Sequence, residues 1–334
     1  MKAVQVKEKG GDFHVVEIDK PSPEENEVLI KVEACGICHS DAFVKNGAFP
    51  GIEYPRVPGH EVVGIVEEVG PRVNNWKKGQ RVGVGWHGGH CFECEPCRRG
   101  DFISCENAKI SGISYDGGYA EFMTAPQEAV ASIPEDLSSA EAAPLLCAGI
   151  TVFNALRNSG ITAGDTVAVQ GIGGLGHLAI QYAAKMGMRT VAISTSDSKK
   201  ELAEELGAHH FINAKQKDAA KELQNMGGAK LILATAPNSE AITSVIGGLG
   251  IDGKLLMVAA TGDPIEVSPM ELLMGRKSVA GWPSGTAMDS EDTLKFSAMT
   301  GTKPKIEEYP LDKVSEAYDK MINNKARFRV VLKP

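Results

Sequence analysis

Apolar and polar positions alternate in short segments over the first third of the chain. This alternation predicts β-strands, because successive side chains of a strand point to opposite faces of a sheet. The strands are expected at residues 3–6, 14–18, 27–34, 62–69 and 80–84. Glycine and proline interrupt the segments often, which is typical of an irregular, mostly-β barrel.

From about Ala140 the pattern changes to alternating helices and strands. Ser138 or Ser139, followed by Glu141, forms a capping sequence for a helix through residues 142–147, and another helix is expected at 151–159. Strands follow at 166–170, 190–193, 210–212, 230–234 and 254–258, separated by helices at 175–186, 199–206, 219–226 and 239–246. After about Pro269 the alternation stops, and helices at 290–299 and 314–323 and a strand at 328–333 complete the chain.

The change of pattern predicts two domains. Alternating strands and helices are typical of a doubly wound parallel sheet with right-handed crossovers, an α/β architecture. We therefore expect an α/β domain at residues 150–285, inserted into a mostly-β domain made of residues 1–149 and 286–334. A chain of 334 residues has the length of about two domains.

Composition and charge exclude several classes of protein. The chain is 43% hydrophobic and 23% charged, so it has ordinary globular usage and is not disordered or fibrous. It contains no apolar run of transmembrane length, and its first residues resemble neither a signal peptide nor a transit sequence, so we expect a cytoplasmic protein. With 35 basic and 43 acidic residues the net charge is −8, and neither nucleic acid nor a membrane is an expected partner.

Four of the seven cysteines lie within fifteen residues. Cys91, Cys94, Cys97 and Cys105 have the spacing C-x2-C-x2-C-x7-C. Short C-x2-C steps bring thiolates together on one ion, and four cysteines form the tetrahedral set of a structural zinc site. An iron–sulfur cluster also uses this spacing, but the charged loop around the cysteines offers little apolar shielding, which favours zinc.

Three further potential ligands are dispersed. Cys38 lies in ACGICHSD, His60 in VPGHEVVG and Cys147 in PLLCAGIT. Each has a simple alternative explanation, because free cysteine is often a small buried apolar residue and a single histidine is often a surface residue. Spacing alone does not establish a shared site.

A glycine-rich turn lies between a predicted strand and a predicted helix. The run VAVQGIGGLGHLA contains Gly171, Gly173, Gly174, Leu175 and Gly176 in the G-x-G-x-x-G pattern. In this context the glycines allow a tight turn, the approach of a pyrophosphate and close packing of helix on strand. The motif predicts a Rossmann dinucleotide site, whereas the alternative is a glycine-rich turn without a ligand.

The end of the next predicted strand bears on the choice of coenzyme. NAD-binding folds usually carry an acidic residue there, but this chain has Ser194, followed by Thr195, Ser196 and, on the next helix, Lys199. Hydroxyl groups and lysines suit a 2′-phosphate, so NADP(H) is favoured over NAD(H). The alternative is that these hydroxyls only cap the helix, and Asp197 is unfavourable for a phosphate.

These motifs occur in an order that resembles the zinc-dependent alcohol dehydrogenases of the medium-chain dehydrogenase/reductase superfamily over nearly the whole chain, closest to microbial and cinnamyl-alcohol-dehydrogenase-like enzymes. The resemblance implies a GroES-like catalytic domain and two zinc ions per chain. Cys38, His60 and Cys147 would bind the catalytic zinc, and the four clustered cysteines would bind a structural zinc in a lobe of about residues 88–106.

The resemblance also implies roles for residues near the catalytic zinc. Glu61 corresponds to a carboxylate that approaches the metal, Asp41 to the acid that orients the histidine ligand, and Ser40 to the hydroxyl that passes on the substrate proton. Thr151 would contact the nicotinamide, and Trp86 would line the substrate pocket or serve as a core residue. Phe43 replaces the histidine of the usual proton relay, so His39 or water would assist. His87, His90, His209 and His210 match no site and are expected in loops or on the surface.

The implied activity is hydride transfer between a nicotinamide coenzyme and a primary alcohol or aldehyde. Polyols, sugars and ketones remain alternative substrates, and a non-catalytic dinucleotide-binding protein is an alternative of a different class. Relatives form homodimers or homotetramers through the α/β domain, so a homo-oligomer is expected.

Overall fold

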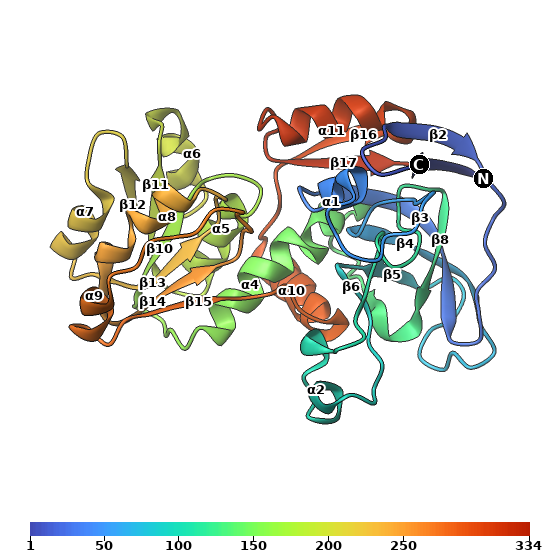
Figure 1. The fold of residues 1–334 in the computed structure, drawn as a ribbon, viewed down its shortest axis with the longest axis horizontal. Helices are drawn as coiled ribbons and strands as arrows, with labels where there is room; N and C mark the ends of the chain where they lie inside the picture. Colours follow the sequence, from blue (N-terminus) through green and yellow to red (C-terminus); the bar gives the residue numbers. More distant parts are fainter. The chain divides into compact units, whose positions relative to one another are not determined.

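The computed structural model describes all 334 residues, which form two compact units. The first comprises Met1–Ile150 and Gly285–Pro334, and the second comprises Thr151–Ser284. Figure 1 shows the first unit in blue, green and red and the second in yellow-green to orange. Each unit has its own sheet and its own buried apolar core.

The first unit is built around a seven-stranded, mainly antiparallel sheet with the order β16-β17-β3-β4-β5-β9, and β8 also pairs with β3. The last strand, β17, pairs antiparallel with β3, so the C-terminus returns to the N-terminal half. Two small sheets, β1-β2 and β6-β7, complete it. Its strands are β1 (Lys2–Val6), β2 (Phe13–Glu17), β3 (Glu27–Ile37), β4 (Val62–Val69), β5 (Arg81–Val84), β6 (His87–Gly89), β7 (Lys109–Ile110), β8 (Phe122–Pro126), β9 (Val130–Ser132), β16 (Ile306–Pro310) and β17 (Arg329–Lys333).

Helices of the first unit are mostly short. They are α1 (Asp41–Asn46), α2 (Glu95–Arg98), α3 (Ser139–Ala142), α10 (Ala287–Thr300) and α11 (Val314–Ile322), with 3₁₀ turns at Phe102–Ser104, Gln127–Ala129, Ala143–Leu146 and Leu311–Lys313. The capping box predicted at Ser138 and Glu141 is present at the start of α3.

The helix expected through residues 142–147 is broken. Helix α3 ends at Ala142, a 3₁₀ turn covers Ala143–Leu146, and Cys147 has the non-helical dihedrals φ −129° and ψ −69°. Pro144 explains the break, because proline lacks the N–H that an α-helix interior requires. Helix α4 (Ala148–Asn158) begins directly after Cys147, so the cysteine lies at a bend.

The second unit contains a six-stranded parallel sheet with the order β12-β11-β10-β13-β14-β15. Its strands are β10 (Thr166–Gln170), β11 (Arg189–Ser194), β12 (His210–Asn213), β13 (Ala229–Ala234), β14 (Leu249–Met257) and β15 (Ser278–Gly281). Its helices are α5 (Gly176–Lys185), α6 (Lys200–Glu205), α7 (Ala219–Asn225), α8 (Ser239–Thr243) and α9 (Pro269–Leu273), besides most of α4 and 3₁₀ turns at Asp197–Lys199 and Ile246–Gly248. This doubly wound order confirms the predicted α/β fold.

One expectation about this sheet is wrong. The alternation of helix and strand does not stop at Pro269, because α9 and β15 follow, and β15 pairs in parallel with β14. The segment SVAG of β15 is short and half-exposed, as befits an edge strand, so it lacks the apolar run that marks the central strands.

No single helix is long and apolar enough to cross a bilayer. The segments Ser139–Leu146 and Ala148–Asn158 meet that length and hydropathy only when they are joined, and the chain bends by 53° between them.

Candidate metal centres and coenzyme site

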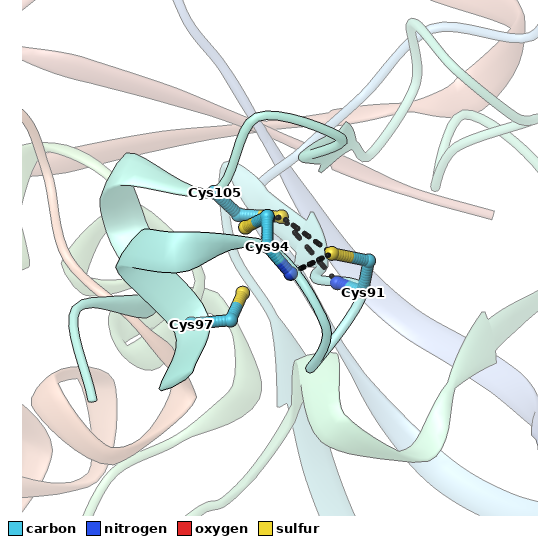
Figure 2. Close-up of side chains that lie close together, drawn as sticks. All are labelled: Cys91, Cys94, Cys97 and Cys105. Atoms are coloured by element: carbon cyan, nitrogen blue, oxygen red, sulfur yellow. Dashed lines mark hydrogen bonds between the residues drawn. The ribbon is translucent and has the colours of Figure 1, made fainter. Parts of the chain in front are cut away.

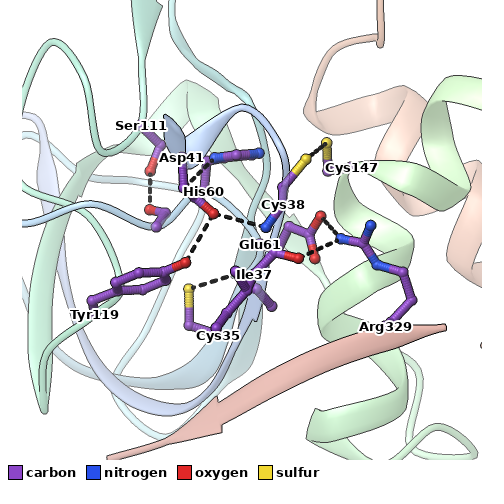
Figure 3. A network of polar contacts seen from close by, with 12 residues as sticks. Cys35, Ile37, Cys38, Asp41, His60, Glu61, Ser111, Tyr119, Cys147 and Arg329 are labelled. Carbon is purple, nitrogen blue, oxygen red and sulfur yellow. Dashed lines mark hydrogen bonds and ion pairs between the residues drawn. The ribbon is translucent and has the colours of Figure 1, made fainter. Parts of the chain in front are cut away.

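Three distant segments of the first unit meet at one point. Cys38 follows β3, His60 and Glu61 precede β4, and Cys147 lies at the bend before α4. The potential ligand atoms of these four residues all lie within 4.8 Å of one another, and the two sulfur atoms are 3.9 Å apart. Figure 3 shows the cysteine sulfurs facing each other across this point. The predicted dispersed ligands are therefore brought together.

His60 is oriented by a carboxylate. Its Nδ1 lies 3.1 Å from Oδ1 of Asp41, and both side chains are almost completely buried. Nε2 of His60 and Oε2 of Glu61 are buried without a hydrogen-bond partner. A buried polar atom without a partner is costly, so these atoms fit a site that a metal ion completes.

Glu61 is a carboxyl group in a buried environment. Burial raises the pKa of Glu61 to about 7, opposed by the charge of Arg329, which donates a hydrogen bond to Oε1. Arg329 is also buried, and it donates a second bond of 3.1 Å to the carbonyl of Ile37. The hydrogen bond with Cys147 lowers the pKa of Cys38, which favours the thiolate form that binds metals.

Aromatic rings cover one side of His60. The Trp86 ring is edge-on to the imidazole, with centroids 5.0 Å apart. Phe43 and Phe49 lie 6.4 Å and 6.3 Å from Trp86. Phe43, which the resemblance to the family placed at the position of a relay histidine, is thus part of an apolar group.

The remaining residues expected near the catalytic zinc are positioned as follows. Ser40 directly precedes α1, is half-buried, and makes no capping hydrogen bond with its side chain. His39 is solvent-exposed. Thr151 is buried in the first turns of α4, four residues after Cys147, and belongs to the second unit.

The clustered cysteines form a second group in the first unit. The sulfurs of Cys91, Cys94, Cys97 and Cys105 all lie within 4.8 Å of one another (Figure 2). Backbone N–H groups of Cys91 and Asn107 donate to the Cys105 sulfur at 3.4 and 3.3 Å. Backbone N–H groups of Cys94 and Glu93 lower the pKa of Cys91 to about 6. This environment stabilises thiolates and suits a closed tetrahedral metal site.

Two histidines beside this group are not simple surface residues. His87 lies on β6 and is only 4% exposed, and its Nε2 is 3.3 Å from Nδ1 of His90. The His90 ring stacks on Phe102 at 4.2 Å. Burial, with a further contribution from His90, lowers the pKa of His87 to about 4. The expectation of an ordinary loop or surface position is wrong for His87, because the short sequence HGG gave no strand pattern.

The glycine motif forms the expected turn between β10 and α5. Gly171 has φ +96°, which side chains rarely adopt, and a Cβ on Gly176 would lie 1.9 Å from the carbonyl oxygen of Gly171. A Cβ on Gly173 would meet nothing within 4 Å. Gly171 and Gly176 are therefore required for the backbone conformation and packing of the turn, whereas Gly173 borders open space. Helix α5 begins at Gly176, so its N-terminal N–H groups face this turn.

Polar residues lie at the end of β11 and just after it, at the same edge of the sheet. Ser194 is buried, and Thr195 and Ser196 are exposed. The Ser196 hydroxyl accepts from the N–H of Ser198, so it caps the following 3₁₀ turn. Lys199 Nζ donates to the carbonyl of Ile172, in the glycine turn, at 2.7 Å. Asp197, the unfavourable charge, accepts a 2.7 Å bond from Gln216.

Two residues that contact the site around His60, Arg329 and Tyr119, were not among the residues predicted from the sequence. The sequence could have indicated Arg329, because it is a charged residue within the apolar segment FRVVL. No sequence pattern around Tyr119, in DGGYAEF, indicates a role at the site. The Tyr119 hydroxyl donates to Oδ2 of Asp41 at 2.8 Å.

Comparisons with known proteins agree with this architecture. Residues 24–135 match the family model of the alcohol dehydrogenase GroES-like domain, and residues 174–299 match that of the zinc-binding dehydrogenases. The alcohol dehydrogenase patD of Penicillium expansum is 47% identical over 326 residues, which cover 98% of this chain and 95% of the relative.

Solved structures show the same fold. A cinnamyl alcohol dehydrogenase from Sorghum bicolor superposes with a TM-score of 0.90 at 31% identity, covering 99% of this chain and 97% of that one. CAD from Helicobacter pylori, solved in complex with NADP(H), gives a TM-score of 0.89 at 28% identity, with the same coverage of both chains. The order of motifs, the two units and these similarities together establish that the chain belongs to the zinc-dependent alcohol dehydrogenases of the medium-chain dehydrogenase/reductase superfamily.

Proposed function

We propose that this enzyme transfers a hydride between a primary alcohol or aldehyde and NADP(H), using a catalytic zinc bound by Cys38, His60 and Cys147. The observation that carries the proposal is the convergence of these side chains around a buried His60 Nε2 that has no protein partner. Two cysteines and one histidine leave one position of a tetrahedral zinc open for substrate.

When bound, zinc supplies a Lewis acid for the substrate oxygen, and NADP(H) supplies the hydride acceptor or donor. The protein holds the metal and controls the proton. Oδ1 of Asp41 lies 3.1 Å from Nδ1 of His60, a position that would hold the imidazole with its Nε2 lone pair directed at the metal. Glu61, held by Arg329, is a carboxylate beside the ligands.

Oxidation of an alcohol releases a hydride to the coenzyme and a proton to the protein. The Ser40 hydroxyl, whose side chain does not cap α1, is the group we assign to the first proton transfer. Phe43 offers no imidazole for a second transfer, so water or the exposed His39 takes the proton onward. In the reverse direction the same groups deliver the proton to the oxygen of the aldehyde.

The assignment of NADP(H) is supported by the residues after β11. Ser194 replaces the acid that would repel a 2′-phosphate, and the Thr195 and Ser196 hydroxyls are exposed. Lys199 bridges to the glycine turn, which places a positive charge beside the phosphate-binding backbone. The Asp197 carboxylate accepts a hydrogen bond from Gln216. The Ser196 hydroxyl caps the 3₁₀ turn, but its side chain is also exposed to solvent. Thr151 is assigned to the nicotinamide end of the coenzyme.

The second zinc is assigned to Cys91, Cys94, Cys97 and Cys105. Four sulfurs within 4.8 Å of one another leave no position open for substrate, so this ion would be structural. It would tie the loop around α2 into one lobe.

Apolar primary alcohols and aldehydes are the substrates we favour. Trp86, Phe43 and Phe49 form an aromatic group against His60, and such a surface favours an apolar chain or ring over a polyhydroxylated substrate. Polyols and ketones are therefore the second choice.

Metal analysis tests the zinc assignment. The wild type should contain two zinc ions per chain, and Cys38→Ser and Cys147→Ser should each retain one and lose turnover. Cys35→Ala is the matched control, because Cys35 is a buried cysteine that belongs to neither group of potential metal ligands. Full activity in either depleted variant would overturn the assignment.

Initial rates test coenzyme and substrate. NADPH and NADH are offered in parallel to the zinc-replete enzyme, with one aromatic and one short aliphatic aldehyde. Faster consumption of NADPH is expected. A preference for NADH would mean that the hydroxyls after β11 only cap the helix. Consumption of neither coenzyme would favour polyols, ketones or the non-catalytic alternative.

A homodimer or homotetramer is proposed for the assembly. In the second unit β15 is an edge strand, and the neighbouring α9 segment exposes Leu273 and Met274 at 73% and 80%. Large exposed apolar side chains beside a free sheet edge are typical of an association surface. Light scattering of wild type and Met274→Lys tests this, and a monomeric wild type would contradict it.

A further inference from the structure

Tyr119 is not one of the proposed zinc ligands, but it contacts a residue beside the site of Cys38, His60 and Cys147. It lies in the loop before β8 and is completely buried. Its backbone N–H donates to Pro58 at 3.0 Å, and its carbonyl accepts from Val4 at 2.8 Å, so both sides of the residue are fixed. A Cβ on Gly59 would lie 2.5 Å from the Tyr119 ring, which shows how closely the ring packs beside His60. The tyrosine ring has little freedom to move.

The hydroxyl of Tyr119 is directed at Asp41 (Figure 3). Oδ2 of Asp41 accepts two bonds, 2.7 Å from the backbone N–H of Cys38 and 2.8 Å from Tyr119. Oδ1 of the same carboxylate faces His60 Nδ1 at 3.1 Å. Two donors on Oδ2 thus fix the plane in which Oδ1 meets the imidazole.

We propose that Tyr119 is a positioning residue of the catalytic metal centre, which acts through Asp41 to hold His60 with Nε2 directed at the metal. The inference rests on the proposed function. Without the phenol O–H, one anchor of the buried carboxylate is lost, and the carboxylate can turn about its remaining bond to Cys38. Partners of this kind orient metal ligands, and their loss typically weakens metal binding by about 10–100-fold.

The variant Tyr119→Phe removes only the hydroxyl. Tyr115→Phe is the matched control, because the Tyr115 hydroxyl also donates within the first unit, to the carbonyl of Gly88 at 3.0 Å, but does not touch Asp41. Zinc affinity of the catalytic site is measured on both holoenzymes by competition with a chromogenic chelator. Tyr119→Phe should bind catalytic zinc about tenfold more weakly, and Tyr115→Phe should equal the wild type.

Two further measurements separate positioning from general stabilisation. Cobalt substituted at the catalytic site should show shifted d–d bands in Tyr119→Phe, whereas a merely structural loss would lower the unfolding midpoint without changing the spectrum. In an Asp41→Ala background, Tyr119→Phe should cause no additional loss of zinc affinity, because its partner is gone.

The outcomes distinguish this inference from the proposed function. If wild-type enzyme holds no more zinc than Cys38→Ser, the catalytic zinc itself is wrong. If the wild type holds that zinc and Tyr119→Phe matches it in affinity and cobalt spectrum, the role of Tyr119 is overturned. Additive losses in the Asp41→Ala background would show that Tyr119 does not act through Asp41.

Discussion

Arg329 donates a hydrogen bond to the Glu61 carboxylate although 268 residues separate them in the chain. The arginine lies on β17, the last strand, and the glutamate directly follows His60, the proposed zinc ligand. Because β17 pairs with β3, the strand that leads to Cys38, the end of the chain supplies the counter-charge of the site formed near its beginning. The catalytic unit is therefore complete only when its C-terminal segment has folded back.

Removing Arg329 should destabilise the protein strongly. Arg329→Met leaves Glu61 buried without its partner, and breaking a buried ion pair in this way costs about 3–5 kcal/mol. The free energy of unfolding is measured by urea titration. Lys333→Met is the control on the same strand, because its pair with Glu308 is about half exposed and is expected to contribute below about 1 kcal/mol. Equal effects of the two substitutions would refute the structural role of the buried pair.

The buried His87 should make folding sensitive to acid. Burial lowers its pKa to about 4, so below about pH 6.5 the unfolded chain binds a proton there that the folded chain does not. Stability is therefore lost as the pH falls from 6.5 towards 4, and between pH 6.5 and 5 the loss is about 2 kcal/mol at about 1.4 kcal/mol per pH unit.

Urea unfolding at pH 6.5 and pH 5 measures this loss in the wild type and in His87→Gln. The variant should be less sensitive to pH by that amount. His14→Gln, at an exposed position on β2, should retain the wild-type dependence. An unchanged pH dependence in His87→Gln would show that this histidine does not carry the effect.

The glycine turn allows a test that separates coenzyme binding from folding. Gly173→Ala adds a Cβ that contacts nothing in the protein, so stability should hold while coenzyme affinity falls about tenfold or more, because the methyl group occupies the approach of the pyrophosphate. In Gly176→Ala the Cβ would collide with the Gly171 carbonyl, so folding itself should suffer. Fluorescence titration with NADPH and thermal unfolding record the two effects. Unchanged affinity in Gly173→Ala would argue against a phosphate at this turn.

Lys199 should distinguish NADPH from NADH. Lys199→Ala removes a charge beside the glycine turn, and we expect KM for NADPH to rise about tenfold with a smaller change for NADH. Lys200→Ala is the neighbouring control, since Lys200 lies 4.0 Å from Glu204 on the exposed face of α6. A parallel rise for both coenzymes in Lys199→Ala would mean that the lysine only anchors the Ile172 carbonyl.

The lobe that contains Cys91, Cys94, Cys97 and Cys105 should stabilise the fold but take no part in catalysis. Cys97→Ser is expected to lose one zinc, to lower the melting temperature, and to leave the zinc at Cys38 and Cys147 in place. Structural zinc sites contribute folding energy directly, so the loss is expected to be several kcal/mol. Metal analysis combined with calorimetry checks this. Two zinc ions per chain in Cys97→Ser would contradict the assignment of the lobe.

Short motifs in the sequence predicted many of the site residues. The four cysteines lie within one loop, and the glycine turn lies between adjacent elements, so short-range spacing reflects their geometry. No short-range spacing connects Cys38, His60 and Cys147, and they were grouped only through the resemblance to a family. The structure brings them together because the end of β3, the start of β4 and the bend after Pro144 lie at the same point.

The sequence by itself determined the fold class, the glycine turn and the residue types available for metal ions, because these depend on hydrophobic periodicity and on short-range spacing. Tertiary structure alone decided which charged and polar groups pair over long distances in the sequence. Two contacts join segments that are far apart in the sequence: the pairing of Arg329 with Glu61 and the bond from Tyr119 to Asp41. The burial of His87 likewise depends on segments that pack around it in the folded protein. Such contacts arise from the register and closure of the sheet, which local patterns do not specify.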